Sequence, residues 1–233
     1  MKLKAILSSL FFPERCNICG SIKPFLKSYC PKCGVDTKFI SPDACPKCGH
    51  EKCMCNSKSF IDLPHFAAVY YYQGQLKYSI LRFKFHSESS YADIFGKAMS
   101  ERMKELYGDI TFDGVCFVPM TRENEKVRGY NQSKLLASKV ADDLNIPLIP
   151  CLIKEKSSLS QKSLSAKDRT QNLKGSFAVK GDVKDKVLIL CDDIKTTGAT
   201  FKECSDTLMS AGAKDVYCLS LALTPYIRYT DIF

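Results

Sequence analysis

Residues 187–200 read VLILCDDIKTTGAT and join an apolar run, an acidic pair and a loop rich in threonine and glycine. The run Val187–Cys191 is typical of a parallel strand buried on both faces of a sheet. A helix is expected over Thr200–Ala211, because Gly212 follows it as a stop signal. The stretch therefore predicts a strand, a loop and a helix in succession, with the acidic pair at the carboxyl end of the strand.

The loop offers hydrogen-bonding groups for two different chemical partners. Thr196–Thr200 would present backbone N–H groups and hydroxyls at a helix N-terminus, an arrangement that binds anions. The carboxylates of Asp192 and Asp193 would accept hydrogen bonds from vicinal sugar hydroxyls. The stretch lacks the Gly-Lys-Ser/Thr of a Walker loop and the GxGxxG of a dinucleotide fold. We therefore expect a site for a phosphate beside a ribose, rather than a surface turn.

Strand and helix signals alternate from residue 60 onward. Helices are expected over Gln75–Phe85 and Tyr91–Tyr107, and a third follows a cap at Asn131 or Ser133. The further expected strands are Ala67–Tyr72, Val115–Val118, Leu148–Ile153, Phe177–Val179 and Val216–Leu223. Such alternation predicts the α/β class, with a parallel sheet flanked by helices.

Eight of the 13 cysteines lie within residues 16–55, in the patterns C-x2-C-x10-C-x2-C and C-x2-C-x4-C-x-C. They are Cys16, Cys19, Cys30 and Cys33, then Cys45, Cys48, Cys53 and Cys55. Two C-x2-C turns can complete a tetrahedral four-sulfur shell, so the spacing predicts two structural zinc ions, with an iron–sulfur cluster or redox dithiols as alternatives. We expect sequential pairing, although interleaved pairing stays open. His50 is expected to be a solvated loop residue rather than a substitute ligand.

Composition excludes several classes of protein. The chain has 233 residues, of which 45% are hydrophobic and 25% charged, and no apolar run is long enough for a membrane-spanning helix. The other five cysteines occur singly, which is typical of small core residues in a reducing compartment, so a cytoplasmic location is expected. Eight thiolates and two zinc ions would lower the formal charge of +9 to about +5.

A short amphipathic helix is expected near the N-terminus. Leu3, Ile6, Leu7, Leu10 and Phe11 recur at helical spacing. Pro13-Glu14-Arg15 stands where a signal peptide would need small cleavage-site residues. With the cysteine patterns, this predicts a small zinc-binding domain over residues 1–59 and an α/β domain over residues 60–233.

Lysines and aromatic residues are interleaved along the cysteine-rich segment. The lysines are Lys23, Lys27, Lys32, Lys38, Lys47, Lys52 and Lys58, and the aromatic residues are Phe25, Tyr29 and Phe39. Such a surface can hold single-stranded nucleic acid through phosphate contacts and stacking. Lysines also keep a small module in solution, and both interpretations stay open.

The stretch at 187–200 closely resembles the phosphoribosyl pyrophosphate (PRPP) motif of type I phosphoribosyltransferases, with Lys195 at a position that usually holds an apolar or small residue. Three features narrow the resemblance: Val118-Pro119 followed by RGYNQ at 128–132; Ser160-Gln161 with Arg169 and Asn172-Leu173; and the cysteine pairs. Together they resemble the ComF family of competence-associated, phosphoribosyltransferase-like proteins over nearly the whole chain. The resemblance implies a zinc finger joined to a type I phosphoribosyltransferase-like domain. It also implies a role in natural transformation and DNA uptake, handling incoming single-stranded DNA beside a helicase-like competence ATPase.

The resemblance further implies roles for individual residues. Asp192 and Asp193 would bind the ribose hydroxyls as the catalytic pair, and the loop residues Lys195, Thr196, Thr197, Gly198, Ala199 and Thr200 would complete the PRPP site, with Mg²⁺ on the pyrophosphate. The segment Pro119–Arg128 would form the loop that faces pyrophosphate, beginning at Pro119, with Arg122 or Arg128 supplying positive charge. Lys167 and Arg169 would contact phosphate from a mobile loop within Lys154–Lys174, a segment that is otherwise interpreted as a solvated flexible loop.

No pocket for an accepting base or amine is recognisable in the sequence. Three hypotheses follow: a competence factor that binds PRPP or DNA phosphates, an active phosphoribosyltransferase, or an adaptor whose cleft is vestigial.

Overall fold

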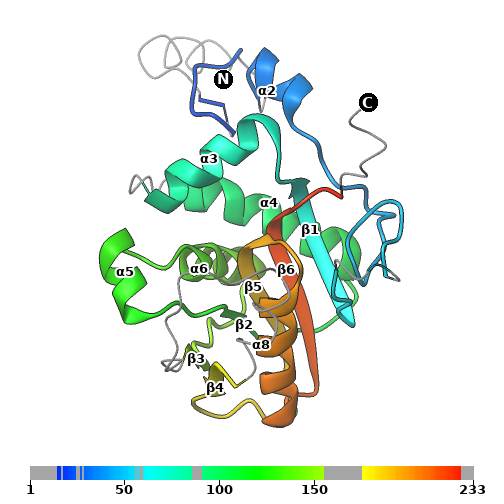
Figure 1. Cartoon of the computed structure of the whole chain (residues 1–233), viewed down its shortest axis with the longest axis vertical. Coiled ribbons are helices and arrows are strands. Elements are labelled where there is room, and N and C mark those ends of the chain that lie inside the picture. Colours follow the sequence, from blue (N-terminus) through cyan, green and yellow to red (C-terminus); the bar gives the residue numbers. More distant parts are fainter. Residues whose placement is uncertain are drawn as a thin grey trace.

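The computed structural model describes residues 15–16, 18–24, 27, 29–55, 57, 60–85, 91–154 and 175–226. A four-stranded sheet with the order β1-β6-β5-β2 lies at its centre (Figure 1). The strands are β1 (His65–Tyr71), β6 (Asp215–Leu223), β5 (Val187–Lys195) and β2 (Gly114–Phe117). All three pairings are parallel, which confirms the predicted α/β sheet.

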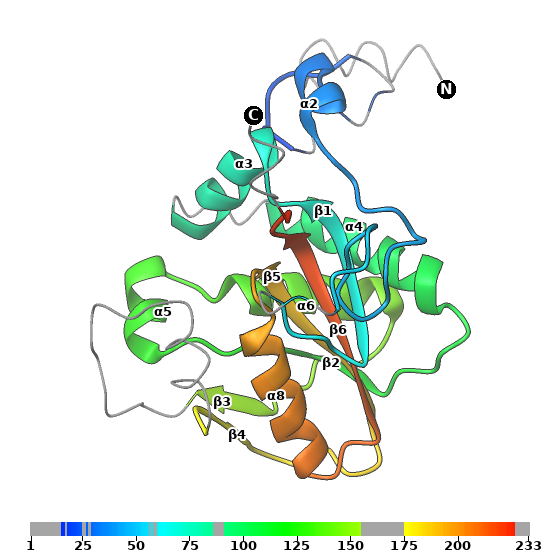
Figure 2. The ribbon, with the colours of Figure 1, turned by 45° about the vertical axis from the view of Figure 1, so that its right-hand side comes forward.

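Both faces of the sheet are covered. Ile189 and Cys191 of β5 belong to the core shared with α4 (Tyr91–Tyr107) and α6 (Gln132–Leu144). Leu188 and Leu190 point the other way, into the core shared with α8 (Ala199–Ser210). Figure 2 shows α8 in front of the sheet with α6 behind it. Because neither face meets water, the strand sequence is continuously apolar rather than alternating.

The strand β5 is longer than its apolar run. Its ladder with β6 continues through Asp192, opposite Ser220, to Lys195, opposite Leu223. The acidic pair therefore lies within the last paired residues of the strand, and the loop begins only at Thr196. Regular hydrogen bonding to a neighbouring strand fixes the backbone that carries both carboxylates.

Two expected segments differ from the prediction. The segment Pro119–Arg128 is not an open loop, because α5 (Arg122–Arg128) forms within it; the Thr121 side chain caps the helix by accepting from the backbone N–H of Asn124, and Gly129 ends it at a φ of 83°. The strand expected over Leu148–Ile153 is also wrong in part.

Within that stretch, Leu148 makes only a single parallel bridge to Val115. Pro150 follows and cannot donate to a ladder. The chain then turns away, so that β3 (Leu152–Lys154) pairs antiparallel with β4 (Phe177–Val179) in a separate ribbon.

The cysteine-rich segment is packed against the sheet. Its short helix α2 (Pro31–Asp36) contacts α3 (Gly74–Phe85), where the Asp36 carboxylate accepts from the backbone N–H of Gln75 at 2.6 Å. Cys16, Ile18, Cys30 and Cys33 are buried in the same core as α4. The first cysteine pairs therefore share a hydrophobic core with the α/β part of the chain.

Residues 38–40 cover the outer edge of the sheet. The Ile40 N–H donates to the carbonyl of Val69 at 3.0 Å, and the carbonyl of Lys38 accepts from the N–H of Tyr71 at 2.9 Å. These bonds make a short antiparallel pairing with β1, visible in Figure 1 as the blue chain that leads from α2 toward β1.

Within the described ranges, no helix has the length and apolar character needed to cross a bilayer. The helix expected before residue 12 lies outside these ranges.

Candidate functional site

The eight cysteines form two separate clusters. The sulfurs of Cys16, Cys19, Cys30 and Cys33 lie within 4.8 Å of one another, and so do those of Cys45, Cys48, Cys53 and Cys55. This confirms the sequential pairing, and the interleaved alternative is wrong. Sulfur–sulfur distances of 3.6 Å occur in both clusters. Four sulfurs at the Zn–S distance of about 2.3 Å in a tetrahedron would stand about 3.8 Å apart, so both sets fit a zinc ion.

His50 is not the solvated loop residue that was expected. Its side chain is only 4% exposed, and its ring packs on Phe60 with the centroids 4.6 Å apart. This desolvation lowers the pKa of His50 to about 4. The second cluster is complete with four sulfurs, so His50 packs beside it rather than replacing a thiolate.

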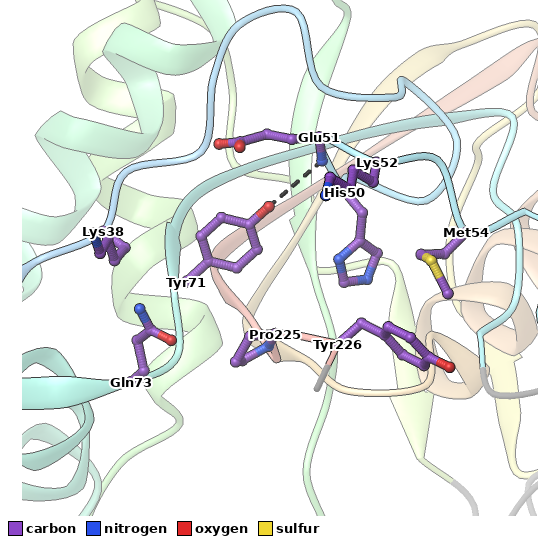
Figure 3. A pocket seen from close by; sticks show the side chains of 9 residues that line it. All are labelled: Lys38, His50, Glu51, Lys52, Met54, Tyr71, Gln73, Pro225 and Tyr226. Atoms are coloured by element: carbon purple, nitrogen blue, oxygen red, sulfur yellow. Dashed lines mark hydrogen bonds between the residues drawn. The ribbon is translucent and has the colours of Figure 1, made fainter. Parts of the chain in front are cut away.

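A cavity of about 360 Å³ opens between the second cluster and the ends of β1 and β6. Figure 3 shows His50, Tyr71 and Tyr226 around it, with Lys38 and Lys52 at its rim. The Tyr71 hydroxyl accepts from the backbone N–H of Glu51 at 3.5 Å. The cavity thus combines aromatic rings with two lysines and the carboxylate of Glu51.

Asp192 is held by the start of α6. Its Oδ1 accepts from the Ser133 hydroxyl at 2.7 Å and from the backbone N–H of Asp193 at 2.9 Å. Asn131 fixes this helix start, because it caps α6 and its side-chain amide donates to the carbonyl of Val118 at 3.2 Å. Burial, followed by the neighbouring Asp193 charge, raises the pKa of Asp192 to about 7. This carboxyl can therefore exchange a proton near neutral pH.

Asp193 has a cationic partner that sequence reasoning missed. The Lys84 ammonium lies 2.9 Å from its Oδ2, and the two side chains are 17% and 11% exposed. Lys84 sits in the last turn of α3, held there by Gln132, whose side-chain amide donates to the Lys84 carbonyl at 3.2 Å. The Tyr130 hydroxyl likewise donates to the carbonyl of Phe83. The RGYNQ stretch thus fastens the end of α3 beside the acidic pair.

The loop after β5 has the form of an anion cradle. Gly198 adopts a φ of 91° as the N-cap of α8, and the hydroxyl of Thr197 accepts from the backbone N–H of Ala199 at 3.3 Å. A Cβ at this position would lie 2.9 Å from Cε of Lys195 and 3.1 Å from the carbonyl oxygen of Ile61, so only glycine fits. Thr196 is exposed, and Thr197 and Thr200 are half-buried. The Ala199 N–H is therefore engaged, and the other N–H groups of the first turn of α8 can serve an anion.

Lys195 was expected to be part of the PRPP site, but its side chain points away from it. Its side chain is 1% exposed, and Nζ donates to the carbonyl of Cys48 at 3.1 Å. The ammonium also lies 4.7 Å from the ring centroid of Phe66. Desolvation lowers its pKa. The side chain therefore runs beneath the loop toward the second cluster, away from solvent.

The residues expected to face pyrophosphate lie on the segment after β2. Pro119 is half-buried and Arg122 is exposed at the start of α5. Arg128 is engaged: it donates to Oε1 of Gln132 at 3.3 Å, and its guanidinium carbon lies 5.1 Å from the ring centroid of Phe85. The expected contacts Lys167 and Arg169 lie outside the described residues.

Comparison with known proteins extends this picture. The sequence model of the double zinc ribbon domain matches residues 7–60, which include both clusters. Competence protein F of Haemophilus influenzae is 28% identical over 216 residues, spanning 88% of this chain and 90% of that protein. Competence protein ComFC of Bacillus subtilis is 28% identical and spans 78% of each chain. The chain is thus similar to competence proteins of the ComF type over most of its length. DNA utilization protein YhgH of Escherichia coli K12 is a further ComF-like relative, 26% identical over 89% of this chain and 90% of its own.

Two solved structures resemble part of this chain. The glutamine PRPP amidotransferase of Bacillus subtilis is 20% identical with a TM-score of 0.43, over 60% of this chain and 30% of that one. A purine phosphoribosyltransferase of Pyrococcus horikoshii is 20% identical with a TM-score of 0.36, over 58% and 77% of the two chains.

Proposed function

We propose that this ComF-like protein binds a phosphoribosyl ligand of the PRPP type at the carboxyl end of β5 and handles single-stranded DNA in competence. The observation that carries the proposal is the meeting of an acidic pair with the glycine N-cap and first turn of α8 at one edge of the sheet. The names of the relatives, which refer to competence and DNA utilization, support the same role.

The site chemistry divides between the two halves of a phosphoribosyl group. Asp192 and Asp193 would accept hydrogen bonds from the ribose hydroxyls, and the first turn of α8 would hold the 5-phosphate. Lys84 pairs with Asp193 in the absence of ligand and would supply positive charge for the pyrophosphate side. Arg122 and, from outside the described residues, Lys167 and Arg169 are proposed to add to that charge. PRPP would bring Mg²⁺ chelated by its own pyrophosphate.

Both cysteine clusters are proposed to hold zinc. Each offers four sulfurs and no open position, so the ions would be structural and take no part in ligand chemistry. Cys53 is exposed whereas Cys48 is buried, so the second ion would lie partly at the surface.

The DNA-handling part of the proposal is supported by the aromatic and cationic cavity of Figure 3. Tyr71 and Tyr226 offer ring faces for a base, and Lys38 and Lys52 offer charge for phosphates. Binding of an oligonucleotide should weaken as salt rises, with a smaller salt slope in Lys38→Met/Lys52→Met. A helicase-like competence ATPase as partner and a cytoplasmic location complete the proposal. The five cysteines outside the clusters are buried free thiols, as a reducing compartment would keep them.

A second candidate function is PRPP-dependent transfer to a nucleobase or amine. It is favoured by Asp192, whose pKa of about 7 suits a group that takes up a proton during catalysis. Release of pyrophosphate that depends on both PRPP and an added base would support it. No release across a panel of bases and amines would leave binding without turnover as the function.

Calorimetric titration with PRPP and Mg²⁺ tests the primary proposal. The wild type is compared with Asp192→Asn/Asp193→Asn and with Asp182→Asn, a control whose carboxylate is 77% exposed. Loss of two charged acceptors should weaken binding about 100-fold. The control should bind like the wild type. Absence of binding to the wild type, or equal binding to the double variant, would contradict the proposal, and the second result would favour a vestigial cleft.

A further inference from the structure

The buried side chain of Lys195 connects two parts of the molecule that are far apart in sequence. It leaves the end of β5, one residue before the phosphate loop, and donates to the carbonyl of Cys48 in the second cluster. The rings of Phe66 and Phe60 lie 4.7 and 5.8 Å from the ammonium. A lysine is rarely this buried unless its charge is compensated. Four thiolates around one Zn²⁺ carry a formal charge of −2, so a loaded second cluster would compensate it.

The same lysine supports the loop from below. The Cε of Lys195 fills the space that a side chain at Gly198 would need. The backbone of Lys195 is fixed from the other side, because its carbonyl accepts from the N–H of Thr224 at 2.9 Å. The position of the ammonium therefore limits where Gly198 and the start of α8 can lie.

A second connection runs through the backbone. The carbonyls of Pro46 and Lys47, inside the Cys45–Cys48 turn, accept from the N–H groups of Phe66 at 2.7 Å and Leu63 at 3.2 Å. Two residues before Leu63, the N–H of Ile61 donates to the carbonyl of Thr197 at 2.8 Å. The Cys45–Cys48 turn, which supplies two ligands of the second cluster, is thus bonded to the segment Ile61–Phe66, and this segment is bonded to the phosphate loop at Thr197.

The first cluster is connected elsewhere. The carbonyl of Cys19 accepts from the guanidinium of Arg82 at 3.2 Å, on the helix that carries Lys84. By contrast, the loop accepts a hydrogen bond from Ile61, and Lys195 just before it contacts Cys48 and Phe66. The two clusters can therefore be separated by experiment.

We propose that the second cluster, when it holds its metal ion, fixes the phosphate loop Thr196–Thr200 through Lys195 and Ile61, so that the order of the loop depends on that ion. Lys195 acts as a positioning residue, since its ammonium touches the cluster and not the ligand space. Loss of the ion has two expected consequences. The change in loop order is independent of the proposed function, whereas weaker binding of phosphoribosyl ligands rests on it.

Hydrogen–deuterium exchange on the full chain tests the loop directly. Cys53→Ser removes an exposed ligand of the second cluster, and Cys19→Ser removes a half-buried ligand of the first, as the matched control. Zinc content is measured on both. Amides of residues 196–201 should exchange about tenfold faster in Cys53→Ser and stay as in the wild type in Cys19→Ser. Equal exchange in the wild type and Cys53→Ser would overturn the proposal.

Lys195→Met tests the contact itself with both clusters intact. The variant should retain two zinc ions, show faster exchange in the same amides and bind PRPP about tenfold more weakly. Lys214→Met changes an exposed lysine just before β6 and should alter neither quantity. Unchanged exchange in Lys195→Met would refute the role of Lys195. If the wild type does not bind PRPP but the variants still differ from it in amide exchange, the proposed function is refuted and this inference is retained.

Discussion

The ion pair between Lys84 and Asp193 gives a quantitative prediction. At a separation of 2.9 Å and an effective dielectric constant of 20, the two charges attract by about 6 kcal/mol. Much of this is offset by desolvation, since the side chains are 17% and 11% exposed. Removing one partner of a buried pair costs about 3–5 kcal/mol, so for this slightly exposed pair we expect about 2–3 kcal/mol.

The assay is a double-mutant cycle by urea unfolding at pH 7 with both clusters loaded. Lys84→Met keeps the apolar stem and removes the charge, while Asp193→Asn removes the opposite charge. The sum of the stability losses in the two single variants should exceed the loss in the double variant by about 2 kcal/mol, which is the coupling energy. The pair Lys202–Asp206 is the control, because its side chains are 44% and 54% exposed. Its coupling energy should stay below about 1 kcal/mol.

A coupling energy for Lys84–Asp193 no larger than that of the control pair would refute the reasoning. It would mean that water screens the acidic pair before any ligand arrives. The end of α3 would then be held by Tyr130 and Gln132 alone, and Lys84 would lose its assigned place in the site.

Three further predictions follow from other features. The pKa of Asp192 is about 7 in the folded protein and 3.8 ordinarily, so the native state binds a proton on this carboxyl more tightly than the unfolded state does. The resulting stabilisation, at most about 4 kcal/mol, is complete below about pH 4 and lost by about pH 7. Asp192→Asn should therefore reduce the difference in the free energy of unfolding between pH 5 and pH 8, measured by urea unfolding. Protein purified without chelators should release two zinc ions per chain to a colorimetric chelator and unfold at a lower temperature afterwards; metal near zero would contradict the zinc assignment. Gly49→Ala should lower the free energy of unfolding by about 2–3 kcal/mol, because φ is 83° and the new Cβ would clash with Cε1 of Phe66. In the control Gly34→Ala the new Cβ meets open space, so the free energy of unfolding should change by less than about 0.5 kcal/mol. Equal effects of the two substitutions would refute the steric argument.

The features that the sequence predicts correctly are those whose cause is local. The apolar run of β5, the acidic pair and the glycine before α8 lie within a dozen consecutive residues, and each has a direct physical signature. The cysteine clusters are similar, because the C-x2-C turn itself brings two ligands together. The sequential pairing follows from short loops between the turns.

The features that escaped prediction depend on contacts between distant segments. Lys84 is one charged residue in the last turn of a helix, and nothing near it in sequence indicates that this turn ends against β5. His50 and Lys195 have polar side chains that suggest solvent, yet each is buried by aromatic residues from another part of the chain. The helix α5 has no buried residue, so it lacks the apolar periodicity by which helices are recognised.

The pairing of residues 38–40 with β1 has a consequence for the solubility of the chain. Strand β1 is nearly all buried, and an uncovered apolar edge strand offers its free N–H and C=O groups to any other chain. Residues 38–40 lie between the two cysteine clusters in sequence, so we expect their place at that edge to depend on the folding of both. Loss of metal would therefore do more than loosen a small module: it would uncover a template for aggregation. A chain cut near residue 60 should accumulate as sheet-like aggregate, and selection for soluble protein would act on the cysteines even where no ligand is bound.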